Sequence, residues 1–334
     1  MAKFLIRRFI ALIALLIATS IVTFGLFTIG PANPAADSCG KSCTPERIAQ
    51  IKIALGLDKP LVTQYWEYMK GLVAGREMGP PDGRYHCAWP CFGRSYQDNQ
   101  FVWDVIKRAL PYTISLAVGA AFIWLVAGVA LGVVAGLNRD RLVDRLAVGA
   151  SALGVSLPVP LIGLTLILMI NTNWHWLPYT SGQAPAFPWN SGGPIAWLKN
   201  FILPWITLAL VFGASYVRLT RANMIETMGE DFIRTAKAKG LPRRTVTLKH
   251  GLRAAITPIV TIFGLDLGGL LGGAVLTESI YSLPGVGKSA AQAVNQEDLP
   301  KILAIVLFAA FFIIVANIIV DILYAVVDPR VRLD

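Results

Sequence analysis

One apolar stretch in the C-terminal part of the sequence decides the class of fold. It reads Ile302-Leu-Ala-Ile-Val-Leu-Phe-Ala-Ala-Phe-Phe-Ile-Ile-Val-Ala-Asn-Ile-Ile-Val-Asp-Ile-Leu-Tyr-Ala-Val-Val327, and Asp321 is its only charged residue. As a helix it would extend roughly 39 Å, which exceeds the roughly 30 Å of a bilayer's hydrocarbon core. We therefore expect a membrane-spanning helix here.

Five more stretches of this kind precede it. They cover Phe9–Ile29, Tyr112–Leu137, Leu146–Asn171, Phe201–Leu219 and Ala255–Leu276. The whole chain is 55% hydrophobic and 15% charged, whereas soluble domains average about 45–50% apolar and about 25% charged residues. The sequence thus predicts an all-α, polytopic membrane protein with six transmembrane helices.

The first stretch could also be a secretory signal, because Lys3, Arg7 and Arg8 precede an apolar run. The apolar run is too long for a typical signal core, and no Ala-x-Ala site closes it neatly. We expect a retained signal-anchor helix.

Basic residues indicate the orientation. With the N-terminus inside, the inside segments 1–8, 138–145, 218–253 and 328–334 hold 17 Lys and Arg against 7 Asp and Glu. This excess follows the positive-inside rule and places both termini in the cytosol. The basic charge is thus explained by topology and is not a nucleic-acid signal, because no compact basic module with interleaved aromatic residues is present.

Four cysteines fall in one long loop on the outside, between the first two spans. They are Cys39, Cys43, Cys87 and Cys91. An oxidising compartment favours two disulfides, whose pairing the sequence leaves open. Free thiols, or a metal site helped by His86, are the alternatives.

Signals for catalysis on this chain are weak. Residues 284–289, Pro-Gly-Val-Gly-Lys-Ser, look like the end of a phosphate-binding loop, but Ser282 stands where that pattern needs its first glycine. The three histidines, His86, His175 and His250, form no cluster in the sequence. We expect no enzyme, no metal site and no cofactor on this chain.

The inside loop between the fourth and fifth spans carries the functional signal. It reads Glu230-Asp-Phe-Ile-Arg-Thr-Ala-Lys-Ala-Lys-Gly240-Leu-Pro242. Acids at the start and good helix formers predict a helix over 231–239, which Gly240 ends and Pro242 prevents from continuing. A second short helix is expected near Arg243. A solvated basic loop is the plain alternative.

This loop resembles the cytosolic signature of bacterial ABC-importer permeases, in the form used by the dipeptide, oligopeptide and nickel branch. The similarity extends over nearly the whole chain: 54–61, 264–275, 283–287 and 320–330 look like other parts of that branch. Phe232 replaces the branch's usual Tyr. Segments around 78–96 and 183–198 are additional.

The resemblance implies a type I ABC-importer permease fold, with an N-terminal span and extracytoplasmic loop over 1–109, a permease core over 110–328 and a cytosolic tail over 329–334. It also implies a bacterial inner-membrane location and several partners: a second homologous permease, two ATPase subunits that carry ATP and Mg, and an extracytoplasmic binding protein that delivers di- or oligopeptides. The residues expected to contact an ATPase are Glu230, Asp231, Arg234, Ala236, Lys239 and Gly240.

Two further sites are expected within this framework. Asp266 is an acid at membrane depth, and such groups are often functional. We expect Asp266, Gly269 and Gly273 to line the translocation pathway, with structural pairing of Asp266 or proton coupling as alternatives. At the outer mouth, we expect contacts to the binding protein or its cargo from Tyr281, Pro284, Gly285 and Val286.

Two alternatives to a peptide importer stay open. One is an importer of the same build for another cargo, such as a nickel chelate or haem. The other is an ion-coupled secondary carrier that uses Asp266, although we see no clear internal repeat of the kind common in such carriers.

Overall fold

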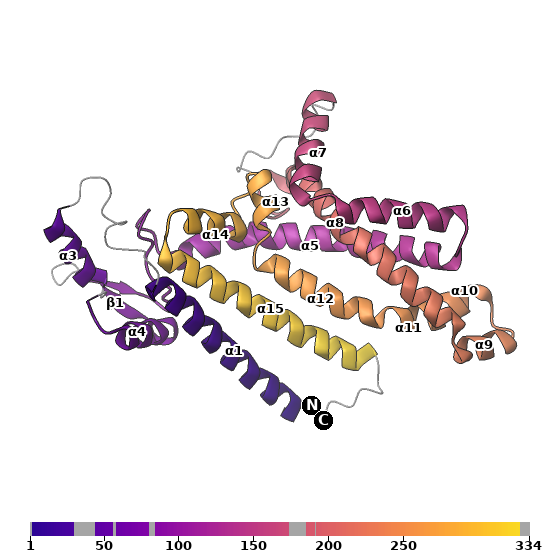
Figure 1. Ribbon diagram of the computed structural model, residues 1–334, viewed down its shortest axis with the longest axis horizontal. Helices are drawn as coiled ribbons and strands as arrows, with labels where there is room; N and C mark the ends of the chain where they lie inside the picture. The colour runs from indigo at the N-terminus through magenta and orange to yellow at the C-terminus, as the bar shows by residue number, and fades with distance from the viewer. Residues whose placement is uncertain are drawn as a thin grey trace.

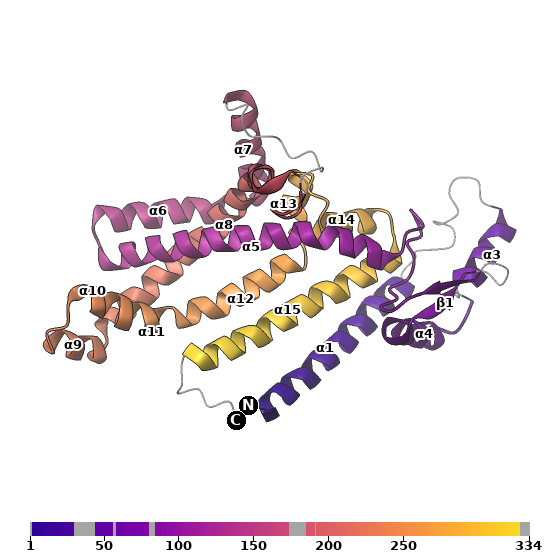
Figure 2. The same ribbon diagram turned by 180° about the vertical axis from the view of Figure 1, so that it is seen from behind.

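The fold is an elongated bundle of long helices (Figures 1 and 2). The computed structural model describes residues 2–29, 44–55, 58–79, 84–173, 185–190 and 192–327. Helix α4 and a small β-hairpin lie at one end of the bundle, which we call the hairpin end, and α9 lies at the other, which we call the knob end (Figure 1). The architecture confirms the expected helical class.

Four helices are each long and apolar enough to cross a bilayer. They are α1 (Ala2–Ile29), α5 (Val102–Leu137), α8 (Gly193–Gly229) and α15 (Leu299–Val327). Two bent pairs of helices would raise the number to six within the described part of the chain, if each pair forms one span. Each of the four long helices extends beyond the apolar stretch expected from the sequence, because polar end turns continue the helix.

The third expected span, Leu146–Asn171, is not one straight helix. It consists of α6 (Leu142–Ser156) and α7 (Val159–Asn173), which meet at an angle of 101°. Pro158 accounts for the break, since proline disfavours helical backbone in the residue before it. Leu157 accordingly has extended backbone, with φ −88° and ψ 125°.

The fifth expected span, Ala255–Leu276, also ends differently. Helix α12 covers Thr257–Leu271 and is bent by 50° from the preceding helical segment. It stops at Gly272, and Gly273 has φ +125°, which glycine adopts more readily than other residues. The chain then forms α13 (Val275–Ile280), α14 (Val286–Asn295) and α15.

Glycines bring α5 and α8 into close contact at the centre of the bundle. Gly128, Gly132 and Gly136 repeat every four residues along α5. A Cβ atom on them would meet side-chain carbons of α8 at 2.7, 2.5 and 2.9 Å, respectively. Small residues at this spacing allow two helix backbones to approach within a membrane. Beside them, Trp124 is fully buried and stacks on Phe212 with ring centroids 4.9 Å apart.

Helix α12 packs on α15 through a second set of glycines. Cβ atoms on Gly268 and Gly272 would lie 2.7 and 2.9 Å from the Cβ atoms of Ala316 and Ala309. Gly268 and Gly272 therefore let α12 and α15 pack closely. Gly269, by contrast, faces open space.

The hairpin end is a small subdomain built from the loop after α1. Its described parts are α3 (Pro45–Leu55), α4 (Leu61–Ala74) and the antiparallel strands β1 (Arg76–Met78) and β2 (Tyr85–Cys87). The described chain is thus mostly helical, and this short hairpin is an addition to the all-α class. A disulfide joins Cys87 to Cys91, whereas Cys39 and Cys43 lie outside the described residues.

We expect mass spectrometry of protein digested without reductant to find Cys87 linked to Cys91 within one short peptide. The two Cα atoms are 5.5 Å apart, a separation that suits a disulfide. A peptide that joins either of these cysteines to Cys39 or Cys43 would contradict the local pairing.

A polar cluster ties the hairpin end to the start of α15. The Lys301 ammonium lies 2.9 Å from Asp98 and 3.2 Å from the fully buried Asp298. The backbone N–H of Tyr96 donates to Asp298 at 3.2 Å. Burial raises the pKa of the Asp98 carboxyl, but hydrogen bonds with Ser95 and Lys301 outweigh it and hold this pKa below its ordinary value. The segment before α5 is thereby fixed to α15.

Candidate functional site

The knob is a compact set of short helical segments at the end of α8. It comprises α9 (Asp231–Ala238), α10 (Arg243–Thr245), a π-helical turn (Val246–Leu252) and α11 (Arg253–Ala255). Ile233, Ala236 and Val246 form its small apolar core, with Met228 of α8 packed against them. The second helix expected near Arg243 is confirmed, although most of it is π-helical.

Gly240 makes the turn between the two halves of the knob. Its φ is +73°, in the left-handed region that costs glycine little and other residues more. A Cβ atom there would meet nothing within 4 Å. The glycine is therefore required by backbone conformation and not by crowding within this chain.

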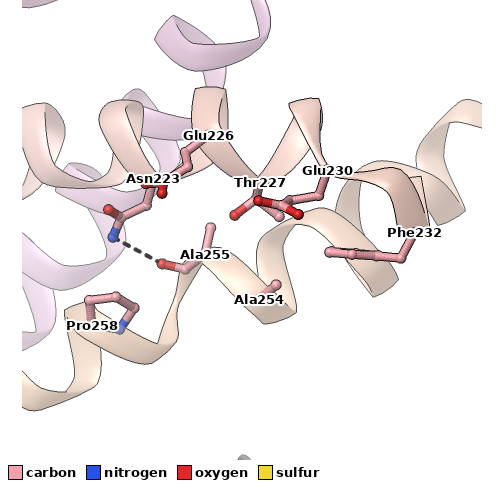
Figure 3. A pocket seen from close by; sticks show the side chains of 8 residues that line it. All are labelled: Asn223, Glu226, Thr227, Glu230, Phe232, Ala254, Ala255 and Pro258. Atoms are coloured by element: carbon pink, nitrogen blue, oxygen red, sulfur yellow. Dashed lines mark hydrogen bonds between the residues drawn. The ribbon is translucent and has the colours of Figure 1, made fainter. Parts of the chain in front are cut away.

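A cavity of about 240 Å³ lies where the knob joins the bundle (Figure 3). The side-chain amide of Asn223 on α8 donates to the Ala255 carbonyl of α11 at 3.2 Å, which ties α8 to the knob (Figure 3). The cavity is lined by Asn223, Glu226, Thr227, Glu230, Phe232, Ala254, Ala255 and Pro258. The carboxylates of Glu226 and Glu230 and the ring of Phe232 thus line the same opening.

The six residues expected to contact an ATPase occupy two different environments. Ala236 is buried in the core of the knob, so its small side chain serves internal packing in this conformation. The other five are exposed: Glu230, Asp231, Arg234, Lys239 and Gly240. Arg234 and Asp231 form an exposed pair with 3.3 Å between Nη1 and Oδ1.

Sequence reasoning missed most of the cavity lining. Asn223, Glu226, Thr227 and Glu230 follow one another at helical spacings of three, one and three residues. Positions i, i+3, i+4 and i+7 share one face of a helix. A polar face at the end of an otherwise apolar helix was the signal that could have revealed this site.

A buried ion pair braces α8 next to the knob. The Arg221 guanidinium donates to both carboxylate oxygens of Asp144 on α6, with 2.8 Å between Nη2 and Oδ2. The backbone N–H of Asp140 also donates to this carboxylate, at 2.9 Å. Both ends of this ion pair are thus held by contacts between α6, the turn before it and α8.

The expected pathway residues separate into two groups. Asp266 accepts a hydrogen bond of 2.8 Å from the hydroxyl of Tyr216 on α8 and is half-buried. Gly269 is exposed on the same side of α12. Gly273, by contrast, lies against α14, since a Cβ atom there would be 2.6 Å from the Gly287 Cα. Gly273 therefore provides a close backbone contact and does not line an open path in this conformation.

Three of the four residues expected at the outer mouth are buried in this conformation. Tyr281 is buried, and its hydroxyl shares a 2.7 Å hydrogen bond with Thr207. Val286 is buried between Ala109 and Ile305. Neither side chain can touch another protein here, because the loop folds back into the bundle. Pro284 remains partly exposed, whereas Gly285 is buried against a carboxylate described next.

The segment that looks like a phosphate-binding loop holds a buried carboxyl group of the same chain. The Glu278 carboxylate is fully buried and accepts hydrogen bonds from Thr113 and from the backbone N–H of Lys288, both at 2.8 Å. A Cβ atom on Gly285 would lie 2.3 Å from the carboxylate carbon. The N-terminus of α14 thus binds a side chain of its own chain, as helix N-termini bind anions generally.

Replacing Glu278 with alanine is expected to destabilise the protein by about 1–3 kcal/mol, because it leaves buried donors without an acceptor. Glu278→Gln retains one acceptor oxygen and should lose less. Thermal unfolding of the detergent-purified variants would measure both. An alanine variant as stable as the unmodified protein would refute this role for Glu278.

Two family models match the sequence and together span most of it. Residues 1–117 match the N-terminal region of binding-protein-dependent transport system membrane components. Residues 128–333 match the binding-protein-dependent transport system inner membrane component. The second match contains α8, the knob and α12 in full.

Full-length relatives agree with these matches. The chain is 34% identical over 351 residues to the dipeptide transport system permease protein DppB of Escherichia coli, with 99% of each chain covered. It is also 34% identical over 334 residues to a putative peptide transport system permease protein of Brucella abortus, with both chains fully covered. A DppB of Alkalihalophilus pseudofirmus is 33% identical over 347 residues. With its membrane-spanning helices, the chain thus belongs to the family of binding-protein-dependent transport system inner membrane components.

Proposed function

We propose that this chain is the permease subunit of an ATP-driven importer of di- or oligopeptides. It forms half of the translocation pathway, and a second homologous permease forms the other half. The peptide cargo is supported by the names of the relatives, which are dipeptide and peptide permeases. The family is named for its dependence on binding proteins. That dependence disfavours the ion-coupled secondary carrier, which was the alternative from the sequence.

The topology that fits this function has six spans, with both bent helix pairs crossing the membrane. The knob end and both termini then face the cytosol, and the hairpin end faces the compartment of the binding protein. The excess of Lys and Arg at the knob end supports this orientation. The N-terminal part would comprise 1–109, the permease core 110–328 and the cytosolic tail 329–334.

The knob carries the proposal. It presents exposed Glu230, Asp231, Arg234 and Lys239, while its apolar core attaches it to α8. The bond from Asn223 to Ala255 joins α8 to the last segment of the knob, which continues directly into α12. A force on the knob would therefore reach both α8 and α12. ATP and Mg bind to separate ATPase subunits in this proposal, and each ATPase contacts one knob.

Two measurements test the function. Affinity purification of the tagged chain from its native membrane should recover a second permease and ATPase subunits. A strain that lacks the chain should lose uptake of labelled dipeptides and regain it on complementation. Uptake of a nickel chelate or haem, with no effect on peptides, would retain the importer and overturn the cargo. Recovery of the chain without any ATPase would overturn the importer.

A further inference from the structure

Helix α4 carries an apolar stripe that the described part of the chain leaves uncovered. Val62, Trp66 and Val73 are 80%, 68% and 74% exposed. Their spacings of four and seven residues put them on one side of the helix. Three exposed apolar side chains along one side of a helix indicate that this side contacts an apolar neighbour.

The adjacent side of α4 packs against two membrane-spanning helices. Tyr68 is buried in a cluster with Leu299, Leu303 and Leu307 of α15. Met69 and Leu72 pack against the same cluster. The position of α4 relative to the bundle is thus fixed by its own contacts (Figure 1).

Contacts with α1 give the depth of α4 relative to the membrane. The hydroxyls of Ser20 and Tyr65 are 2.7 Å apart, and the rings of Phe24 and Tyr65 are 5.5 Å apart. The apolar span in α1 is Ile6–Leu26, so Ser20 and Phe24 lie about 9 and 3 Å inside its edge at 1.5 Å per residue. Helix α4 therefore lies beside the last turns of a membrane span.

Contacts with α15 independently place α4 beside the end of a second membrane span. The apolar span in α15 begins at Leu299, and Leu307 lies about 12 Å from that edge. Val22 and Leu26 lie in the same last turns of the α1 span as Ser20 and Phe24, and both are exposed apolar residues. Amphipathic helices in a membrane interface bury their apolar side about 5–10 Å into the headgroup and acyl boundary.

The third side of α4 is polar. Thr63 is exposed there, and Glu67 pairs with Lys59, which precedes the helix. Tryptophan is enriched at membrane interfaces, where its amphipathic ring suits the headgroup level. We propose that α4 is an interfacial helix, whose Val62, Trp66 and Val73 contact the lipid of the leaflet on the hairpin side.

A photocrosslinking experiment in native membranes tests this proposal. The photoreactive amino acid p-benzoylphenylalanine is placed singly at Val62, Trp66 or Val73, and at Thr63 as the matched control. All four positions are exposed, so the replacements should leave the packing of α4 intact. We expect lipid adducts at the three stripe positions to exceed those at the control by on the order of tenfold.

The other outcomes each overturn the proposal. Adducts between the stripe positions and another protein, such as the binding protein, would make the stripe a protein-docking surface. Equal lipid adducts at all four positions would show that the stripe is no preferred lipid contact, and no lipid adducts at the stripe would place it in water. The test does not depend on the cargo, because it reads only what touches α4.

Discussion

Replacing Gly240 with valine is expected to lower uptake by at least about tenfold while the protein still inserts into the membrane. Gly240 has φ +73°, and a non-glycine residue held in such a region costs about 1–3 kcal/mol. Valine is among the worst choices, because its branched Cβ crowds the backbone. The strain falls on the turn that positions α9 relative to the rest of the knob.

Two matched controls separate backbone strain from other effects. Gly240→Asn should keep most of the uptake, since asparagine tolerates positive φ better than other non-glycine residues. Gly229→Ala at the end of α8 should be nearly neutral, because its Cβ would meet nothing within 4 Å. Labelled-peptide uptake and recovery of the ATPase with the tagged chain are the measurements. Normal uptake by Gly240→Val would refute the role of the turn.

Replacing Asp144 with alanine is expected to destabilise the protein by about 3 kcal/mol. The Asp144 side chain is 3% exposed and pairs with Arg221, which is 26% exposed. Removing one partner of a buried ion pair typically costs about 3–5 kcal/mol, because the other charge stays behind without compensation. The partial exposure of Arg221 places the expected loss at the lower end of that range.

The exposed pair of Arg139 and Asp140 provides the control. The two groups are 3.5 Å apart and both are well exposed, so Arg139→Ala should cost less than about 1 kcal/mol. Thermal unfolding of detergent-purified protein measures both variants. The double change Asp144→Leu with Arg221→Met should recover part of the loss, because no buried charge remains. Equal stability of Asp144→Ala and Arg139→Ala would contradict the argument.

The glycine patterns show how far sequence reasoning reached. The close packing of Gly268 and Gly272 was visible in the sequence, and their α15 contacts confirm it. The repeat of Gly128, Gly132 and Gly136 was just as visible, and it proved to be the contact between α5 and α8. The spacing of the glycines shows that one face of a helix carries small side chains, but it does not show which helix packs against that face.

Proline and glycine likewise mark in the sequence the places where helices end or bend. Gly240 ended α9 as expected, because the left-handed turn is a local property of the chain. The 101° bend at Pro158 interrupted a stretch that hydropathy alone had joined. Gly240 acts on its own backbone and Pro158 on that of the residue before it, so signals of this kind can be read from sequence.

The sequence by itself therefore determined the helical membrane class, the apolar stretches and the turn at Gly240, because hydropathy and backbone preference act over a few residues. Only the tertiary structure decided which buried polar groups meet. Thr113 and Glu278 are 165 residues apart in the sequence, and Asp144 and Arg221 are 77 apart. The structure also turned Tyr281 and Val286 inward and placed α4 beside the edge of two spans. Such contacts depend on how distant helices pack, and these two buried carboxylates accept hydrogen bonds from segments that are far away in the sequence.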